Sequence, residues 1–276
     1  MFGRLETYLE MLKADPVNFL IYMVYTWGVI LISLILHECA HGWMALRCGD
    51  PTAKMMGRLS LNPARHLDPI GTICMFVFGF GWAKPVPVNP RNFQNYRRDD
   101  FLVSIAGVVT NLTIFIICCL LAVVINTAIW NPDFMPLFEY AYGRSDPEFM
   151  VNIFAPAESD YVAAYIAYGF SFDWMKGFTS NYWLLYVQRF LLLMADVNLT
   201  LALFNLLPIP PLDGYHVVND TLLKGRFNLN MQAFNIARIA LIFLLLTGIL
   251  DTFLIKGGEL VGGAVIRTFL QLTGQM

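Results

Sequence analysis

The feature that most constrains this chain is a run of thirty residues, Phe101 to Trp130, that contains no charged side chain. As a helix this run would be about 45 Å long at about 1.5 Å per residue. That is more than enough to cross the hydrocarbon core of a bilayer, which is about 30 Å thick. Composition agrees, because 57% of the residues are hydrophobic and only 14% are charged, against roughly a quarter charged in a soluble domain. We therefore expect lipid to be the main solvent of this protein.

Three other apolar stretches predict further spanning helices. The first, Phe19–Leu36, continues into a more polar segment that ends at Arg47. The others are Tyr182–Leu207 and Phe234–Leu250. Arg189 and Asp196 interrupt the Tyr182–Leu207 stretch and are predicted to be anchors towards its outer end, on the assumption that the helix continues to residue 213.

Shorter segments complete the predicted fold. Ile70–Trp82 is apolar but too short to span, and it contains three glycines, which favours a re-entrant segment. Gly57–Asn62 and Lys84–Pro90 alternate in a β-like or polyproline manner, and Gly257–Met276 is expected to be a short interfacial helix. The predicted fold is an all-α polytopic integral membrane protein, with about four spanning helices, a re-entrant segment and short β-like stretches at the membrane edge.

Charge predicts the orientation in the membrane. Residues 47–100 contain eight Lys or Arg residues, whereas residues 131–181 contain two, together with seven acids. The positive-inside rule places the basic section in the cytoplasm and the acidic loop outside. We expect a single membrane domain over residues 1–276, in the cell membrane of a bacterium. Its core would cover about 19–130 and 182–250, and 131–181 would be an extracytoplasmic loop.

A short motif, His37-Glu38-Cys39-Ala40-His41, lies at the more polar end of the first span. Histidines four residues apart share one face of a helix, so both imidazoles can bind one metal ion. Glu38 lies on the adjoining face, where a carboxylate can take a proton from water at the metal. Ionisable groups in a membrane span are costly and usually functional. The motif therefore predicts a catalytic zinc site.

A catalytic zinc site normally has three protein ligands, so one is missing from the motif. The candidates are His66, His216, Asp196 and Asp213. Asp213 ends the segment NLLPIPPLDG, whose three prolines break the preceding helix. An irregular backbone at membrane depth is tolerated where it lines a cavity, which favours Asp213. His66 is expected to be a polar interfacial residue, and His216 to lie beside the site or face solvent.

The motifs HECAH and NLLPIPPLDG, together with SIAGVVTNL over 104–112, resemble the signatures of the site-2 protease family of intramembrane zinc proteases. The segments GRLSLNPARHLDPIGT and GWAKPVPVNPRNF are similar to those of a minimal bacterial branch that lacks PDZ or CBS domains. This resemblance implies one Zn²⁺ held by His37, His41 and Asp213, with Glu38 as the catalytic base. It also implies structural roles around the site for Gly107, Pro208 and Gly214.

The resemblance further implies that Asn205 or Asn111 stabilises the oxyanion or positions the substrate. A structural amide that ties two helices together is the alternative for each. The implied substrates are membrane proteins with a transmembrane segment, cut within or near that segment, in regulated intramembrane proteolysis or in signal-peptide clearance. The active site would open towards the cytoplasm.

Two other functions compete with this interpretation. One is a membrane protease of a different HExxH family, with a glutamate as third ligand, and the other is a metal transporter or a zinc-stabilised scaffold. A transporter should show several polar spans, and a scaffold has no need of Glu38. The net charge of −2 gives no basic field for nucleic acid, and the five cysteines show no metal or disulfide spacing.

The charge distribution generates a first prediction, which concerns topology. Single cysteines introduced at residues 91–98 should be protected from a membrane-impermeant thiol reagent applied outside intact cells. Cysteines at residues 145–150 should react with it, because the positive-inside rule leaves the acidic loop outside. The opposite labelling pattern would show that the assigned orientation is wrong.

Overall fold

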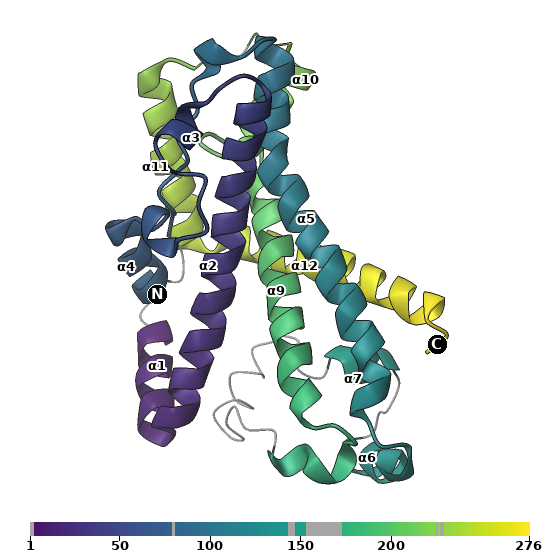
Figure 1. Cartoon of the computed structure of the whole chain (residues 1–276). Coiled ribbons are helices and arrows are strands. Elements are labelled where there is room, and N and C mark those ends of the chain that lie inside the picture. Colours follow the sequence, from purple (N-terminus) through teal and green to yellow (C-terminus); the bar gives the residue numbers. More distant parts are fainter. Residues whose placement is uncertain (1–2, 79–80, 143–146, 153–172, 225, 227–228) are drawn as a thin grey trace. The chain divides into compact units, whose positions relative to one another are not determined.

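The computed structural model describes residues 3–78, 81–142, 147–152, 173–224, 226 and 229–276 (Figure 1). Their contacts form two compact units. Unit 1 comprises Met1–Arg4, Leu31–Thr113 and Asn198–Lys256, and unit 2 comprises Leu5–Ile30, Ile114–Val197 and Gly257–Met276. The division cuts through long helices: residues 31–47, 96–113 and 198–205 fall in unit 1, and residues 16–30, 114–129 and 183–197 fall in unit 2. The sequence prediction of one domain over 1–276 stays a prediction.

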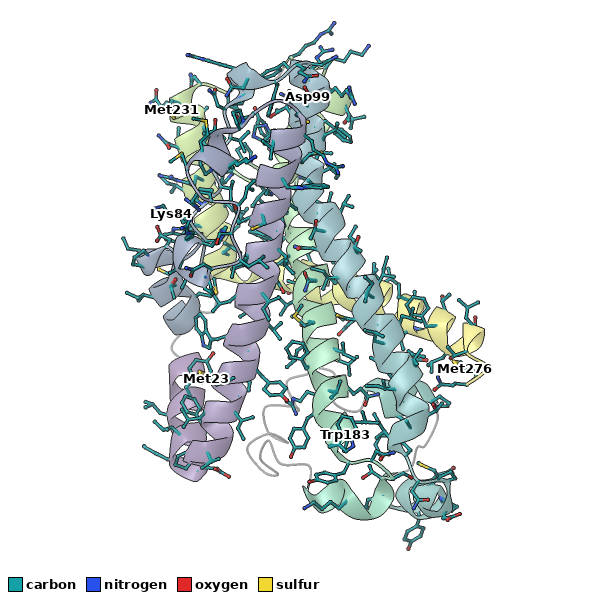
Figure 2. All side chains as sticks on the ribbon, viewed as in Figure 1. Met23, Lys84, Asp99, Trp183, Met231 and Met276 are labelled. Carbon is teal, nitrogen blue, oxygen red and sulfur yellow. The ribbon has the colours of Figure 1, made fainter. Side chains whose placement is uncertain are left out.

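Among the described residues, three helices are long and apolar enough to cross a membrane: α2 (Pro16–Arg47), α5 (Tyr96–Ile129) and α9 (Trp183–Asn205). They are candidate membrane spans and coincide with three of the four stretches predicted to span. Large apolar side chains remain exposed along them, as lipid contact requires: Val24 on α2 is 70% exposed and Val109 on α5 is 52% exposed. Figure 2 shows side chains projecting from the outer faces of these helices.

The fourth predicted span differs in its boundaries. Helix α11 (Met231–Thr247) ends at Gly248, which adopts a left-handed conformation with φ of 71°. Helix α12 (Ile249–Leu272) follows at once, and the two helices form one span only if the 72° bend between them is allowed. The stretch Gly257–Met276 was expected to be a short interfacial helix; it is helical as far as Leu272, but it belongs to the 24-residue α12, which begins eight residues earlier. Its interior glycines cost about 1 kcal/mol each relative to alanine but do not stop it.

Between α2 and α5 the chain forms short elements: α3 (Thr52–Met55), η1 (Pro63–Arg65), α4 (Pro69–Phe78) and η2 (Pro90–Asn92). Helix α4 overlaps the predicted re-entrant segment, Ile70–Trp82, and begins one residue before it. A Cβ on Gly71 would lie 2.2 Å from the Trp82 carbonyl oxygen, and one on Gly81 would lie 2.1 Å from the Gly71 carbonyl oxygen. The two ends of this segment therefore lie against each other. A re-entrant segment requires this, because it leaves and returns on the same side of the membrane.

Between α2 and α5, β-type pairing among the described residues is limited to an isolated antiparallel bridge between Leu67 and Ala83, extended by a 2.7 Å hydrogen bond from the Lys84 N–H to the His66 carbonyl. Neither Gly57–Asn62 nor Lys84–Pro90 forms a strand in the part of the chain that the structure describes. For Lys84–Pro90 the physical reason is that the prolines at 85, 87 and 90 lack the backbone donors that a ladder needs.

Asp50 fixes the loop that follows α2. Its side chain is fully buried and accepts hydrogen bonds from the Asn89 N–H and the Asn92 side-chain amide, both at 2.7 Å, and from Thr52. Burial alone would raise the pKa of the Asp50 carboxyl, but these hydrogen bonds outweigh it and lower the pKa. The loop over residues 84–95 is thereby tied to the end of α2, the helix that carries the HECAH motif.

Unit 2 packs around Ile129, Trp130, Met150 and Leu185. The predicted loop 131–181 contributes η3 (Pro132–Phe134), α6 (Met135–Tyr142), α7 (Pro147–Asn152) and η4 (Asp173–Phe178). Its segments 143–146 and 153–172 lie outside the described residues. Helix α1 (Gly3–Ala14) precedes α2.

The predicted place of Asp196 is wrong. Helix α9 ends at Asn205 and does not continue to residue 213, so Asp196 lies only nine residues, or about 13 Å, before the helix end. This places it in the middle of α9 rather than towards the outer end. Arg189 is buried, with 4% of its surface exposed.

Candidate metal centre

Helix α2 presents His37 and His41 one turn apart on the same face. The two Nε2 atoms are 3.0 Å apart, and the side chains are only 6% and 12% exposed. Helical spacing within a continuous apolar helix is sufficient to bring these two nitrogens together.

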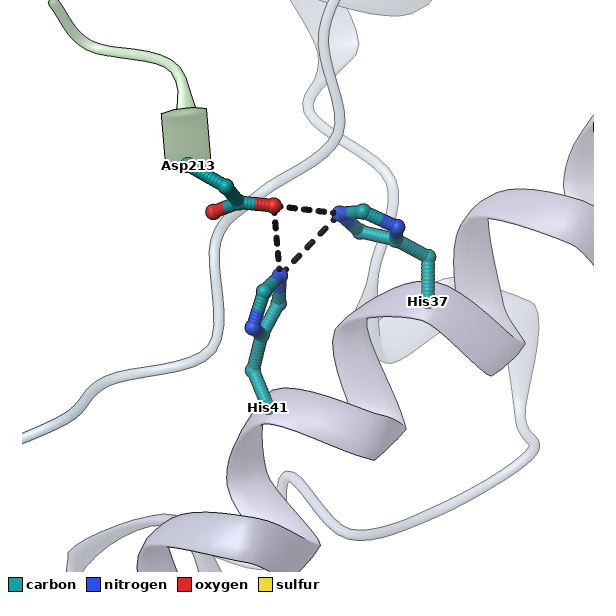
Figure 3. A group of neighbouring side chains, drawn as sticks. All are labelled: His37, His41 and Asp213. Atoms are coloured by element: carbon teal, nitrogen blue, oxygen red, sulfur yellow. Dashed lines mark hydrogen bonds and ion pairs between the residues drawn. The ribbon is translucent and has the colours of Figure 1, made fainter. Parts of the chain in front are cut away.

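Asp213 reaches the two histidines through a turn. Helix α9 stops at Asn205, the chain turns through Pro208, Pro210 and Pro211, and helix α10 (Asp213–Thr221) begins at the aspartate. The Asp213 Oδ2 atom lies 3.3 Å from the Nε2 atom of His37 and 3.3 Å from that of His41 (Figure 3).

Gly214 makes this turn sterically feasible. A Cβ at this position would lie 2.3 Å from the carbonyl oxygen of Leu206 and 2.6 Å from that of Leu207. Real side chains do not approach backbone so closely, so only glycine fits here. The turn that delivers Asp213 therefore depends on the residue that follows it.

The three ligand atoms fit a small divalent cation. Zinc binds nitrogen and oxygen at about 2.0–2.2 Å in a tetrahedron, and two corners of such a tetrahedron are about 3.4 Å apart by this geometry. The observed separations of 3.0, 3.3 and 3.3 Å agree with that value. Each of the three residues offers one ligand atom, and these atoms lie within 4.8 Å of one another. Among the described residues, they form the group of His, Cys, Asp or Glu side chains that could hold a metal ion.

Electrostatics favour an ionised carboxylate in this group. Burial alone would raise the pKa of the Asp213 carboxyl, but hydrogen bonds and positive charge from the two adjacent imidazoles, when these are protonated, lower it well below its usual range. The Oδ2 atom is buried and has no hydrogen-bond donor of good geometry in the described structure. It is thus a negative oxygen aimed at the two histidine nitrogens, which a cation would satisfy.

The surroundings of His41 fix its ring. Its Nδ1 atom lies 2.7 Å from the Val103 carbonyl oxygen on α5, so it is the nitrogen that carries the proton, and the Nε2 lone pair is left for the metal. Gly107, one turn further along α5, allows this close contact. A Cβ there would lie 2.5 Å from His37 Cε1 and 2.6 Å from His41 Nε2.

Glu38 lies beside the three candidate ligands without joining them. Its side chain is half-buried, and its Oε2 atom accepts a 2.8 Å hydrogen bond from the Val86 N–H. A carboxylate next to a metal site that does not itself bind the metal can act as a base towards water.

The two asparagines expected to assist the reaction differ in their contacts. Asn205 donates its side-chain amide to the Leu201 carbonyl one turn earlier in α9, at 3.0 Å. Asn111 is fully buried one turn beyond Gly107, and neither polar atom of its side chain has a hydrogen-bond partner in the described structure. Pro208 is exposed, just beyond the end of α9.

The other two histidines lie outside the three-residue group. His66 was expected at an interface but is buried, with 1% exposure, and its Nε2 atom is 2.6 Å from the Ser60 carbonyl oxygen. His216 pairs with Asp100, with 3.1 Å between Nδ1 and Oδ2, and this contact raises the pKa of His216.

One buried polar residue near the site was not anticipated from the sequence. Arg58 is 8% exposed and donates to the carbonyl oxygens of Lys84 at 2.7 Å and Pro85 at 3.2 Å. From the sequence, Arg58 was considered only as one of the eight basic residues of 47–100 that predict the orientation in the membrane. The two prolines that deprive residues 84–88 of donors were the available signal, because they leave carbonyls that need a partner.

A helical membrane protein with two motif histidines and an aspartate around one point defines the class of membrane metalloproteases. The family model of peptidase family M50 matches residues 25–247, and the chain belongs to this family. It is 36% identical over 210 residues to the protein named "Putative zinc metalloprotease YwhC" of Bacillus subtilis (strain 168), covering 76% of this chain and 73% of that protein.

A second relative is the protein named "Putative zinc metalloprotease Rip2" of Mycolicibacterium smegmatis (strain ATCC 700084 / mc(2)155). It is 29% identical over 132 residues, covering 45% of this chain and 49% of that protein. No solved structure matches the chain. The family match makes this protein a zinc metalloprotease with candidate transmembrane helices, as the sequence motifs predicted, and decides against the transporter and scaffold interpretations.

The glycine contact at the site gives a second prediction. Gly107→Ala should weaken zinc binding by about 10- to 100-fold, the usual effect of disturbing the groups that orient metal ligands, because the new methyl group would push both imidazoles aside. Zinc affinity of the purified protein is measured by competition with a chromophoric chelator.

The matched control is Gly258→Ala in helix α12, where a Cβ would meet nothing within 4 Å. This variant should bind zinc like the parent protein. Equal affinities for both alanine variants would contradict the close packing of Gly107 against the two histidines.

Proposed function

We propose that this protein is an intramembrane zinc protease that hydrolyses peptide bonds in or near transmembrane segments of membrane proteins. The observation that carries the proposal is the convergence of His37, His41 and Asp213 on one point beside a spanning helix. His37 lies ten residues before the end of α2 at Arg47, which is about 15 Å along the helix axis. This distance from the helix end supports a site at the depth of the bilayer.

The three side chains would hold one Zn²⁺, and the ion would polarise the substrate carbonyl and make a water molecule acidic near neutral pH. His37 and His41 supply neutral imidazole nitrogens. Asp213 supplies a negative charge that offsets part of the charge of the ion in a poorly solvated place. Glu38 takes the proton from the attacking water and can pass it to the leaving amine.

Asn111 is proposed to position the substrate, because its amide is buried near the site without a partner. For Asn205 the corresponding role as oxyanion donor requires it to give up its bond to Leu201. The roles proposed for Pro208 and Gly214 are structural: they form the turn that places Asp213.

The proposed setting is the cell membrane of a bacterium, with the active site open towards the cytoplasm, on the grounds of the basic residues between α2 and α5. The partners are the lipid bilayer and a substrate with a transmembrane segment, and nucleic acid is not among them. Such substrates would be single-span regulators in regulated intramembrane proteolysis or leftover signal peptides.

A third prediction concerns the third ligand. In Asp213→Ala, zinc should fall well below one ion per protein, because the ion loses its anionic ligand. In His66→Ala and His216→Ala it should stay near one, because neither histidine lies in the three-residue group. Zinc is measured in purified protein by elemental analysis. The assignment is wrong if Asp213→Ala retains zinc while one of the histidine variants loses it.

A fourth prediction separates catalysis from metal binding. Glu38→Gln keeps both histidines but removes the base, so its zinc content should match the parent. Cleavage of single-span model substrates in detergent should fall by about 10²- to 10⁴-fold. A chelator should abolish cleavage by the parent protein, and substantial cleavage by Glu38→Gln would argue against its role as the base.

A further inference from the structure

We propose that Arg58 is a positioning residue, which acts through the backbone N–H of Val86 to hold the carboxylate of Glu38 in the orientation that proton transfer needs. The inference rests on the proposed function, because it assigns Glu38 the part of the base. It concerns contacts within unit 1 alone.

The contact with Glu38 is a single charge-assisted hydrogen bond. The Val86 N–H donates to Glu38 Oε2 at 2.8 Å, which leaves the Oε1 atom to accept a proton. Val86 is 7% exposed and lies between Pro85 and Pro87. Neither proline has an N–H, so a shift of this segment by one residue would leave Glu38 without a donor.

Arg58 holds the segment from its carbonyl side. Its Nη2 atom donates to the carbonyl oxygens of Lys84 and Pro85, the two residues immediately before Val86. The Lys84 N–H bonds to the His66 carbonyl at 2.7 Å. Three hydrogen bonds therefore fix the backbone just before the N–H that contacts Glu38, and the guanidinium supplies two of them.

Close packing keeps the segment against α2 next to the base. Gly42 lies one turn after Glu38 on the same face of α2. A Cβ on Gly42 would lie 2.9 Å from Val86 Cγ1 and 2.6 Å from Leu59 Cδ2. The segments that carry Arg58 and Val86 thus lie against the helix at the position of the base.

A glutamate needs such support because its side chain has three rotatable bonds and loses considerable entropy when it is held in one conformation. Catalytic groups work within a narrow range of positions, and small displacements cost rate rather than substrate affinity. Loss of Arg58 should therefore lower kcat and leave both KM and zinc content almost unchanged.

The test compares Arg58→Met with Arg58→Lys in the zinc-loaded, full-length protein, on single-span model substrates. Arg58→Met should lower kcat by about 10-fold, as expected for one hydrogen bond to a charged group, with KM within about twofold by the same argument. Arg58→Lys retains a cationic donor and should restore most of kcat. The matched control is Arg65→Met, since Arg65 is an exposed arginine of the same loop that bonds to the Gly57 carbonyl instead.

Replacing the Val86 amide by an ester, with the α-hydroxy analogue of valine, removes the N–H and keeps the side chain. This should lower kcat as Arg58→Met does, and the same replacement at Val88 should not. Unchanged kcat in Arg58→Met, an effect on KM or zinc alone, or equal effects at both ester positions would overturn the inference.

Hydrogen exchange provides a readout that does not depend on activity. Only Lys84, Val86 and Val88 have an amide proton between residues 84 and 88. The Val86 proton should exchange slowly in the parent and faster in both Glu38→Ala and Arg58→Met. If Glu38→Ala leaves it protected, the contact is absent and the inference falls. If the Val86–Glu38 contact is present but the parent protein cleaves no substrate, the proposed function is contradicted and the contact itself is not.

Discussion

The imidazoles of His37 and His41 and the carboxylate of Asp213 have to be held against one another on α2, a helix that also exposes large apolar side chains. Each of these groups is costly to place in an apolar medium unless it is paired or binds a metal. In this protein the cost is offset locally: the nitrogens of His37 and His41 and an oxygen of Asp213 lie 3.0–3.3 Å apart, so that one divalent ion can satisfy all three. The remaining features of unit 1 bring these three groups together or keep them in place.

Glycines allow the backbone to approach closely both the histidines and the turn before Asp213. Gly107 lets α5 pack directly on the two imidazoles, and Gly214 lets the start of α10 lie against the Leu206 and Leu207 carbonyls. In both places a methyl group would lie less than 2.8 Å from an atom of the site or its support. The close approach of α5 also places the Val103 carbonyl on His41, so that one contact sets both the packing and the tautomer.

The sequence predicted the parts of the site that follow from local spacing. The pair His37 and His41 needs only a helix, and the prolines before Asp213 indicate where a helix must stop. Three candidate spans followed from apolar length, although Arg189 and Asp196 interrupt the third. What failed depended on where helices begin and end: Asp196 was misplaced because its helix was taken to continue to residue 213, and the last helix begins at Ile249 rather than at Gly257. His66 and Arg58 were missed as buried residues because their burial depends on contacts between loop segments; for Arg58 the prolines at 85 and 87 were a local signal that its partners would be backbone carbonyls.

The loop between α2 and α5 shows how an irregular backbone can be kept next to such a site. Asp50 binds the Asn89 N–H, Arg58 binds the carbonyls of Lys84 and Pro85, and Glu38 binds the Val86 N–H. Each polar backbone group in this series is paired with a charged side chain rather than with a neighbouring strand. Prolines make this arrangement specific, because they remove the competing donors and leave Val86 alone to meet Glu38. The same residues that prevent a regular sheet therefore define which backbone group contacts the proposed base.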